Sequence, residues 1–470
     1  MNKYVKLLKN TILVFGGNIG SKVITLLMMP LYTRWLSVEG YGITDMLTIY
    51  VTLLLSIVSC CIPEALFVFP SGQVDEKKKE YFSSGFAFNL LTFSISAAIF
   101  WIVDILDNYA HWNNTFTQNI WFIYTMLVTQ VLQQQSQQFA RSSNHMIVYS
   151  LTGLIYTICV AAFSFLFVPR YGVPGYVYSI IIANIISAAY SFLFSRAYDF
   201  LRVCSVKIDI AKEMLRYSIP LIPNSIMWWL VNALNRPMME NTLGLHDIGI
   251  YAVANRFPGI LSMVFTVFAT SWQISVIEEY RNNGFEDFYN KVFKIVFSSL
   301  SILLICVTFS SKLLISVFAD SQFFEAWKYV ATLSFGTMIS CMSGFLGSIF
   351  SATRESKYYL YSSIWGAIIS ILLNYFLIPS WGLYGAAISI LISFFTISIS
   401  RILYSWRTVK IKNVSYYIFV LVLLGIIILF YIKSSLIWAS IISFIASTYM
   451  LYMNRHILNN VFNSVKNIRK

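Results

Sequence analysis

Apolar residues fill most of this chain in long runs that short polar connectors separate. Each run is close to the length of an α-helix that crosses the hydrocarbon core of a bilayer. Apolar and polar positions do not alternate within the runs, which favours helices over the strands of a membrane barrel. The pattern predicts an all-α integral membrane protein with about 14 transmembrane helices. The predicted spans cover residues 10–33, 42–69, 82–104, 118–140, 146–168, 174–196, 217–235, 248–275, 292–317, 327–350, 358–378, 382–404, 415–432 and 435–453.

Two pairs of sequence matches indicate a duplicated half. PLYTRWLSVEGYG at residues 30–42 matches PMMENTLGLHDIG at residues 237–249, an offset of 207. PRYGVPG at residues 169–175 matches PSWGLYG at residues 379–385, an offset of 210. Related halves are common in transporters, whose sites lie between the repeats. The matches predict that the chain contains two related halves.

Composition and charge agree with a membrane protein and exclude a nucleic-acid binder. The 470 residues are 58% hydrophobic and only 11% charged, with a mean hydropathy of +0.69. The net charge is +13, but the basic residues sit in the connectors, as topology determinants do. A cytoplasmic N-terminus puts 25 Lys and Arg, Arg401 among them, on the cytoplasmic side and 6, including Arg236, outside. This bias predicts that both termini are cytoplasmic.

Two basic residues, Lys22 and Arg256, fall deep inside predicted spans, whereas the other basic residues lie in connectors or within about five residues of the end of a span. A cation at the centre of a bilayer is costly, so such residues usually border water or meet a partner. Asn18 stands one turn before Lys22 on the same helix face. The favoured interpretation is a polar, cationic cavity. The alternatives are an internal ion pair, with Glu64 or Asp45 as the carboxylate, and a side chain that snorkels to the interface.

The fourth and seventh predicted spans carry stripes of amide side chains. In the fourth span the stripe is Gln130, Gln134, Gln137 and Arg141. Amides both donate and accept hydrogen bonds, which suits sugar hydroxyls, although hydrogen bonding between helices explains the stripe equally well. In the seventh span the stripe is Asn224, Trp228, Asn232 and Asn235. There an aromatic ring among amides fits sugar stacking, and Trp near a membrane interface is the ordinary alternative.

Two carboxylates of the second span, Asp45 and Glu64, are candidates for coupling to H⁺ or Na⁺. Pairing with an intramembrane base is the alternative for both. Nothing in the sequence indicates covalent chemistry, a metal or a cofactor. The GxxxxGK[ST] phosphate loop is absent, the four His have no HxxxH spacing, and the six Cys have no metal-ligand spacing. The chain is therefore not expected to be an enzyme.

The N-terminal segment from Leu7 to Gly42, LxxNTxxxxxGxxxxKxxxLxxxPLYTRxLSxExYG, resembles the Wzx-type O-antigen and polysaccharide flippases. These belong to the MOP exporter superfamily, together with lipid II flippases and MATE drug exporters. The resemblance implies two pseudo-symmetric six-helix lobes, over residues 1–205 and 206–412, and two further helices over residues 413–470. The lobes would surround a central cavity that opens alternately to each side. The same resemblance implies a bacterial inner-membrane protein that carries an undecaprenyl-diphosphate-linked oligosaccharide from the inner to the outer leaflet, with Lys22 and Arg256 attracting the diphosphate or acidic sugars.

The resemblance also implies membrane lipids, a polysaccharide polymerase and chain-length proteins as partners. The alternative activity is a MATE-like, cation-coupled exporter of drugs or other small molecules. That branch typically has an acidic residue in the first span, where this chain has Lys22. A third hypothesis is a scaffold of a polysaccharide assembly complex, which would tolerate every substitution that faces the cavity.

Overall fold

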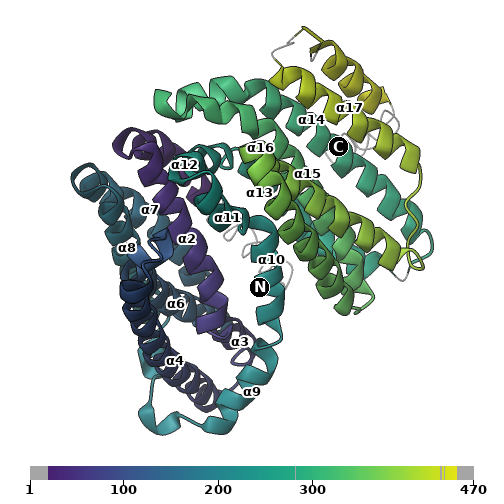
Figure 1. The fold of residues 1–470 in the computed structure, drawn as a ribbon. Helices are drawn as coiled ribbons and strands as arrows, with labels where there is room; N and C mark the ends of the chain where they lie inside the picture. The colour runs from purple at the N-terminus through teal and green to yellow at the C-terminus, as the bar shows by residue number, and fades with distance from the viewer. Residues whose placement is uncertain (1–19, 281, 434–436, 439, 453–470) are drawn as a thin grey trace, which may run out of the picture. The chain divides into compact units, whose positions relative to one another are not determined.

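The computed structural model describes residues 20–280, 282–433, 437–438 and 440–452 (Figure 1). Within these ranges every regular element is a helix, so the all-α prediction is confirmed. Nine of the described helices are long and apolar enough to cross a membrane. Many of their large apolar side chains are exposed, among them Leu91 and Trp101, which suits a helix that faces lipid tails.

Contacts divide the chain into two units, each described here by itself. Unit 1 holds residues 1–252 and 318–320. Its helices are one over residues 20–35, α2 (Val38–Val58), α3 (Ile62–Val68), α4 (Asp75–Ala110), α5 (Thr115–Gln118), α6 (Ile120–Ser142), α7 (Met146–Tyr171), α8 (Val173–Phe194), η1 (Ala197–Asp199), η2 (Val203–Ser205), α9 (Ile208–Ser218), α10 (Leu221–Asn232), α11 (Asn235–Thr242) and most of α12 (Leu245–Ala254).

Unit 2 holds residues 253–317 and 321–470. Its elements are α13 (Gly259–Glu279), α14 (Phe285–Phe318), η3 (Ser321–Ala326), α15 (Trp327–Ala352), α16 (Lys357–Ser405), α17 (Val414–Ile432) and a helix over residues 440–452. The two contact units do not coincide with the lobes predicted at residues 1–205 and 206–412, because residues 206–252 belong to unit 1. The two lobes therefore stay a prediction.

The fourteen predicted spans map onto these helices with one merger and several breaks. The eleventh and twelfth spans form α16, which bends at Gly382. Four predicted spans fall on elements that are not among the nine long apolar helices. The first span falls on residues 20–35, the fourth on α6, the seventh on α9 to α11, and the fourteenth on residues 440–452. For α6 the reason is its glutamines, which lower its hydropathy.

Predicted continuity is wrong for the second, seventh and eighth spans. The second breaks between α2 and α3, where Cys60 and Cys61 have positive φ angles of 48° and 52°. The seventh breaks at residues 219–220 and 233–234, and the eighth at residues 255–258. Pro220 and Pro258 lie at two of these breaks, where the missing N–H ends the preceding helix. Uninterrupted hydropathy concealed these breaks.

The motif matched at residues 169–175 and 379–385 has the same backbone geometry in both places. Gly172 has φ 59° and ψ −128°, and Gly382 has φ 57° and ψ −133°. These positive φ values favour glycine. Three residues later, a Cβ at Gly175 or Gly385 would lie 2.4 or 2.0 Å from the carbonyl oxygen eight positions earlier. Each glycine therefore allows the next helix to pack against the one before it.

The other matched pair of glycines meets inside unit 1. A Cβ at Gly42 of α2 would lie 2.4 Å from the carbonyl oxygen of Leu245, on α12. A Cβ at Gly249 of α12 would lie 2.0 Å from that of Val38, on α2. The backbones of α2 and α12 therefore approach each other at repeat-related positions, which only glycine permits.

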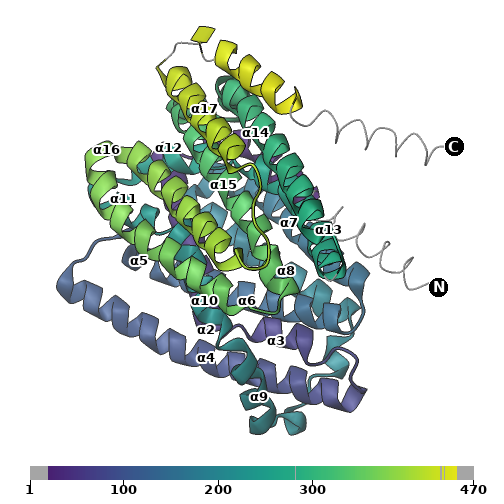
Figure 2. The same cartoon turned by 90° about the vertical axis from the view of Figure 1, so that its right-hand side faces the viewer.

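At one end of unit 1, α9 lies beside the N-terminal part of α4 (Figure 2). The Tyr81 hydroxyl donates to Glu213 at 3.1 Å, and Lys207 pairs with Glu80 just before α9 begins. Hydrogen bonds from Lys207 and Lys77 hold the pKa of the Glu80 carboxyl below its usual range. These contacts fix α9 as a polar helix at the end of the unit.

Candidate functional site

A pocket of about 470 Å³ opens in unit 1 among α2, α3, α6 and α10. This volume is within the range of small-molecule sites. Its walls combine amides, hydroxyls and two indole rings with a single carboxylate. The lining residues are Thr52, Leu55, Ser56, Ser59, Cys61, Glu64, Gln134, Asn224, Ser225, Trp228, Trp229, Asn232 and Ala233.

The pocket brings together predicted residues from three separate spans. Gln134 of α6 lines it, and so does Asn232 of α10, with Asn224 and Trp228 from the same helix. Glu64 lines it from the first turn of α3. The left-handed backbone at Cys60 and Cys61 ends α2 and allows α3 to begin in a new direction. The direction of α3 in turn sets where the Glu64 side chain points. Whether these residues bind a ligand stays a prediction.

Two other residues of the α6 stripe, Gln137 and Arg141, contact residues outside the pocket. Gln137 accepts from Gln133 and donates to the backbone carbonyl of Tyr149, both at 3.0 Å. The Arg141 guanidinium lies 3.9 Å from the centre of the Phe67 ring, a cation–π contact. Gln130, like Gln137 and Arg141, is not among the lining residues. For Gln137, hydrogen bonding between helices, the alternative named above, describes the observed contacts.

The hydrogen-bonding capacity of the pocket is largely unused. The side chains of Gln134 and Asn224 make no hydrogen bond to any described residue. Thr52 and Ser225 donate their hydroxyl protons to carbonyls of their own helices, at 2.8 and 3.2 Å, and keep their lone pairs. Glu64 is exposed and forms no ion pair within the described ranges, so its predicted pairing with Lys22 or Arg256 is not found there.

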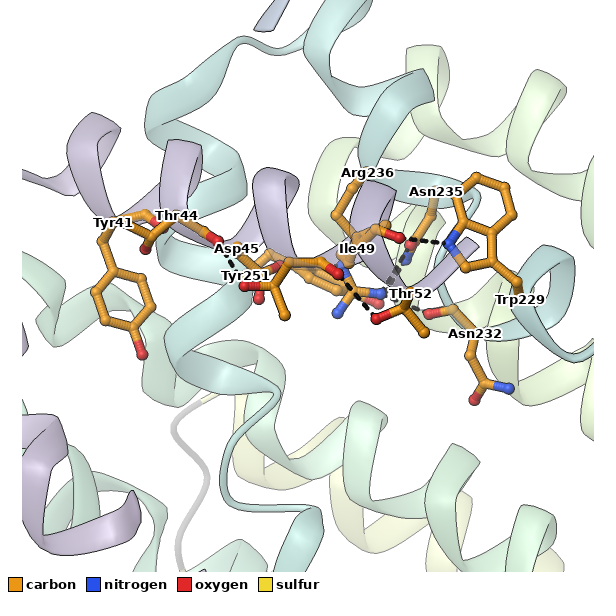
Figure 3. Close-up of polar contacts among 11 residues, drawn as sticks. Tyr41, Thr44, Asp45, Ile49, Thr52, Trp229, Asn232, Asn235, Arg236 and Tyr251 are labelled. Atoms are coloured by element: carbon orange, nitrogen blue, oxygen red, sulfur yellow. Dashed lines mark hydrogen bonds and ion pairs between the residues drawn. The ribbon is translucent and has the colours of Figure 1, made fainter. Parts of the chain in front are cut away.

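A buried ion pair lies beside the pocket (Figure 3). Nε of Arg236 on α11 is 3.4 Å from a carboxylate oxygen of Asp45 on α2, and their side chains are 5% and 14% exposed. The guanidinium also donates to the Asn232 carbonyl at 2.5 Å and to the Asn235 amide oxygen at 3.0 Å. It lies over the Tyr251 ring, 4.9 Å from its centre. Arg236 therefore ties α2, α10, α11 and α12 together.

This network places three residues differently from the expectations drawn from the sequence. Asp45 pairs with Arg236, whereas the alternative to a cationic cavity paired it with Lys22 or Arg256. Arg236 is buried, although it was counted among the outer connectors, because the breaks around α11 fold it back onto α2. Asn235 is 1% exposed, and its amide donates to the Tyr251 hydroxyl at 2.7 Å. It supports Arg236 and does not line the pocket.

A second buried arginine was also missed. Arg401 of α16, counted among the cytoplasmic connectors, is 1% exposed inside unit 2. It donates to the Ser343 carbonyl of α15 at 2.5 Å and to the Ser362 hydroxyl at 3.1 Å, and lies 5.1 Å from the Tyr359 ring centre. No described carboxylate lies within ion-pair distance of it. It lies three residues before the end of the twelfth predicted span, and basic residues near the end of a span were counted with the connector that follows.

The two predicted intramembrane cations have other surroundings. Lys22 is exposed on the helix over residues 20–35 and makes no ion pair with a described residue. Asn18 lies outside the described residues. Arg256 is exposed in the turn at residues 255–258, so its predicted place inside a continuous helix is wrong. Neither Lys22 nor Arg256 lines the pocket.

Comparison with solved structures defines the fold. The lipid II flippase MurJ, in an inward closed conformation, aligns with a TM-score of 0.67 at 14% identity, over 96% of this chain and all of MurJ. A multidrug resistance MATE family transporter, inward-facing, aligns with a TM-score of 0.65 at 12% identity, over 82% of this chain and 94% of its own. The chain is thus a multi-pass membrane protein with the fold of the MOP superfamily.

Sequence comparison defines the family. The family model described as "Polysaccharide biosynthesis protein" matches residues 7–274, so this chain belongs to that family. It is also 23% identical over 269 residues to Lsg locus protein 1 of Haemophilus influenzae, over 55% of this chain. The chain spans 63% of the length of that relative. The resemblance deduced from the N-terminal motif is confirmed.

Proposed function

We propose that this protein is a flippase that carries undecaprenyl-diphosphate-linked oligosaccharide units from the inner to the outer leaflet of the bacterial inner membrane. The observation that supports it is the pocket in unit 1, where unengaged amides and an indole converge in a chain of the polysaccharide biosynthesis family. Hydroxyls and a diphosphate do not cross about 30 Å of hydrocarbon unaided. Side chains that both donate and accept replace the water that the sugar loses.

The predicted topology gives the pocket a direction. With both termini cytoplasmic, Glu64, Gln134 and Asn224 belong to the cytoplasmic halves of their spans. The Asp45–Arg236 pair then lies on the outer side of the pocket within unit 1. A sugar would therefore enter from the cytoplasm. Lys22 and Arg256, neither of which lines the pocket, are proposed to attract the diphosphate during transport.

A cation-coupled exporter of small molecules is the second candidate function. One observation favours it, since Glu64 is a pocket carboxylate that forms no ion pair with a described residue, and a cationic drug or a coupling ion would find a partner there. Asp45 is a weaker candidate for ion coupling, because Arg236 already neutralises it. The two candidate functions differ in what is transported, which is a lipid-linked oligosaccharide for the flippase and a small molecule for the exporter.

The deciding experiment uses a strain that lacks the gene and carries either the wild-type or a variant copy. We expect the double variant Gln134→Ala, Asn224→Ala to reduce surface polysaccharide more than tenfold while its membrane level stays normal. Gln73→Ala, in an exposed connector, is the matched control and should behave as wild type. Normal polysaccharide from the pocket variant, together with dye efflux that Glu64→Gln abolishes, would favour the exporter and contradict the flippase.

A further inference from the structure

From the chemistry of the pocket we infer that the sugar it accepts is rich in hydrogen-bond donors, meaning a neutral or amine-bearing saccharide, and that a sugar carrying a carboxylate is rejected. The inference rests on the proposed function, because it names the cargo of that same pocket. It differs from the expectation that a cationic cavity attracts acidic sugars.

The first step concerns charge. Glu64 is the one carboxylic acid among the lining residues, and within the described ranges the lining has no Lys, Arg or His. The nearby guanidinium of Arg236 is committed to Asp45, Asn232 and Asn235. An acidic sugar would meet a like charge with no facing cation, whereas an ammonium group would meet an opposite charge.

The second step concerns hydrogen bonds. The hydroxyl protons of Thr52, Ser56 and Ser225 go to helix carbonyls, so these oxygens offer acceptors to the pocket. An ionised Glu64 also accepts only, and so adds to this excess of acceptors. Gln134 and Asn224 supply donors as well as acceptors. Hydroxyl and amine groups match this set, while a carboxylate, which only accepts, leaves most of it unmatched.

The third step concerns the aromatic wall. The indole N–H of Trp229 is bound to the Ile49 carbonyl at 3.0 Å, and its side chain is buried, which fixes that ring as structure. Trp228 is half-buried and lines the pocket beside Asn224 and Asn232. Its ring gives the apolar face of a sugar a surface to stack on, with amides at the edges of the sugar.

The test measures binding to the purified full-length protein in lipid nanodiscs. Three probes share undecaprenyl diphosphate and differ in one group, since they carry glucose, glucosamine or glucuronic acid, and undecaprenyl diphosphate without sugar is the reference. We expect glucose and glucosamine to bind at least about tenfold more tightly than glucuronic acid. Glu64→Gln keeps the shape and removes the charge, and should reduce this ratio below about threefold. Glu76→Gln, exposed on α4, is the matched control and should leave the ratio unchanged.

Each outcome decides a point. If glucuronic acid binds as tightly as glucose, the inferred preference is wrong and the flippase proposal stands. A preference that persists in Glu64→Gln also overturns the inference, since the carboxylate would not be its cause. If no sugar-bearing probe binds more tightly than undecaprenyl diphosphate alone, the pocket is not a sugar site, and the proposed function fails with it.

Discussion

The buried pair of Asp45 and Arg236 makes a quantitative prediction about stability. Asp45→Asn leaves a guanidinium that is 5% exposed without a counterion, and Arg236→Met leaves a carboxylate that is 14% exposed in the same position. Removing one partner of a buried pair costs about 3–5 kcal/mol. At roughly 2–4 °C per kcal/mol for a unit of this size, each variant should lose roughly 6–20 °C in thermal midpoint.

Combining the two substitutions separates the energy of the Asp45–Arg236 interaction from the energies of the other contacts that each residue makes. The double variant has no unpaired charge, so it should recover most of the loss, because a neutral replacement of a buried pair is often tolerated. Thermal unfolding of the purified protein in detergent measures all three variants. Asp75→Asn, which breaks an exposed pair with Lys78, is the control and should change stability by less than about 1 kcal/mol. A double variant that loses the sum of the single losses would refute a coupled pair.

Three further predictions concern packing and surface charge. Gly249→Ala should lower the thermal midpoint, since its Cβ would lie 2.0 Å from a carbonyl oxygen, whereas Gly425→Ala meets nothing within 4 Å and should be neutral or stabilising. Arg401→Lys should destabilise unit 2 by about 1–3 kcal/mol, because an ammonium does not reproduce the planar fork of donors. Lys412 donates to Asp287 at 2.5 Å, which lowers the pKa of the Asp287 carboxyl and raises that of the Lys412 ammonium. This pair should contribute stability only between the acidic pH where the carboxyl is protonated and the alkaline pH where the ammonium is deprotonated.

Each of these has an outcome that contradicts it. Equal midpoints for both glycine variants would mean that α2 and α12 do not approach closely at Gly249. An Arg401→Lys protein as stable as wild type would remove the argument for a guanidinium that bridges two helices. For the surface pair, pH scans of wild type and Asp287→Asn in low salt should diverge only inside the stated window, and divergence outside it would contradict the cause assigned to the shifts.

The pattern of apolar runs was sufficient to predict the class of fold, because a membrane span is a local property of about 20 consecutive residues. The breaks were harder. Pro220 and Pro258 are visible in the sequence as helix breakers, but hydropathy continues through them, and the spans were read as continuous. Where a broken helix turns depends on what it packs against, which the sequence does not state.

The site was predictable only in pieces. The amide stripes around Gln134 and Asn232 follow from helical periodicity, and both residues line the pocket. That Glu64 completes the same pocket depends on how α3 leaves α2 at Cys60 and Cys61. The burial of Arg236 and Arg401 was missed because counting basic residues assigns each one by its distance along the chain from an apolar run. Burial is instead decided by packing between helices.

Movement of the cargo itself tests the central claim most directly. The measurement reconstitutes the purified protein in liposomes with an undecaprenyl-diphosphate-linked oligosaccharide and follows, with a membrane-impermeant glycosidase, how fast sugar protected in the inner leaflet becomes cleavable. We predict that wild-type protein exposes the protected sugar much faster than empty liposomes, and that the Gln134→Ala, Asn224→Ala variant is slowed at least about tenfold. Rates equal to those of empty liposomes, or a pocket variant as fast as wild type, would contradict a flippase that carries its sugar through this pocket.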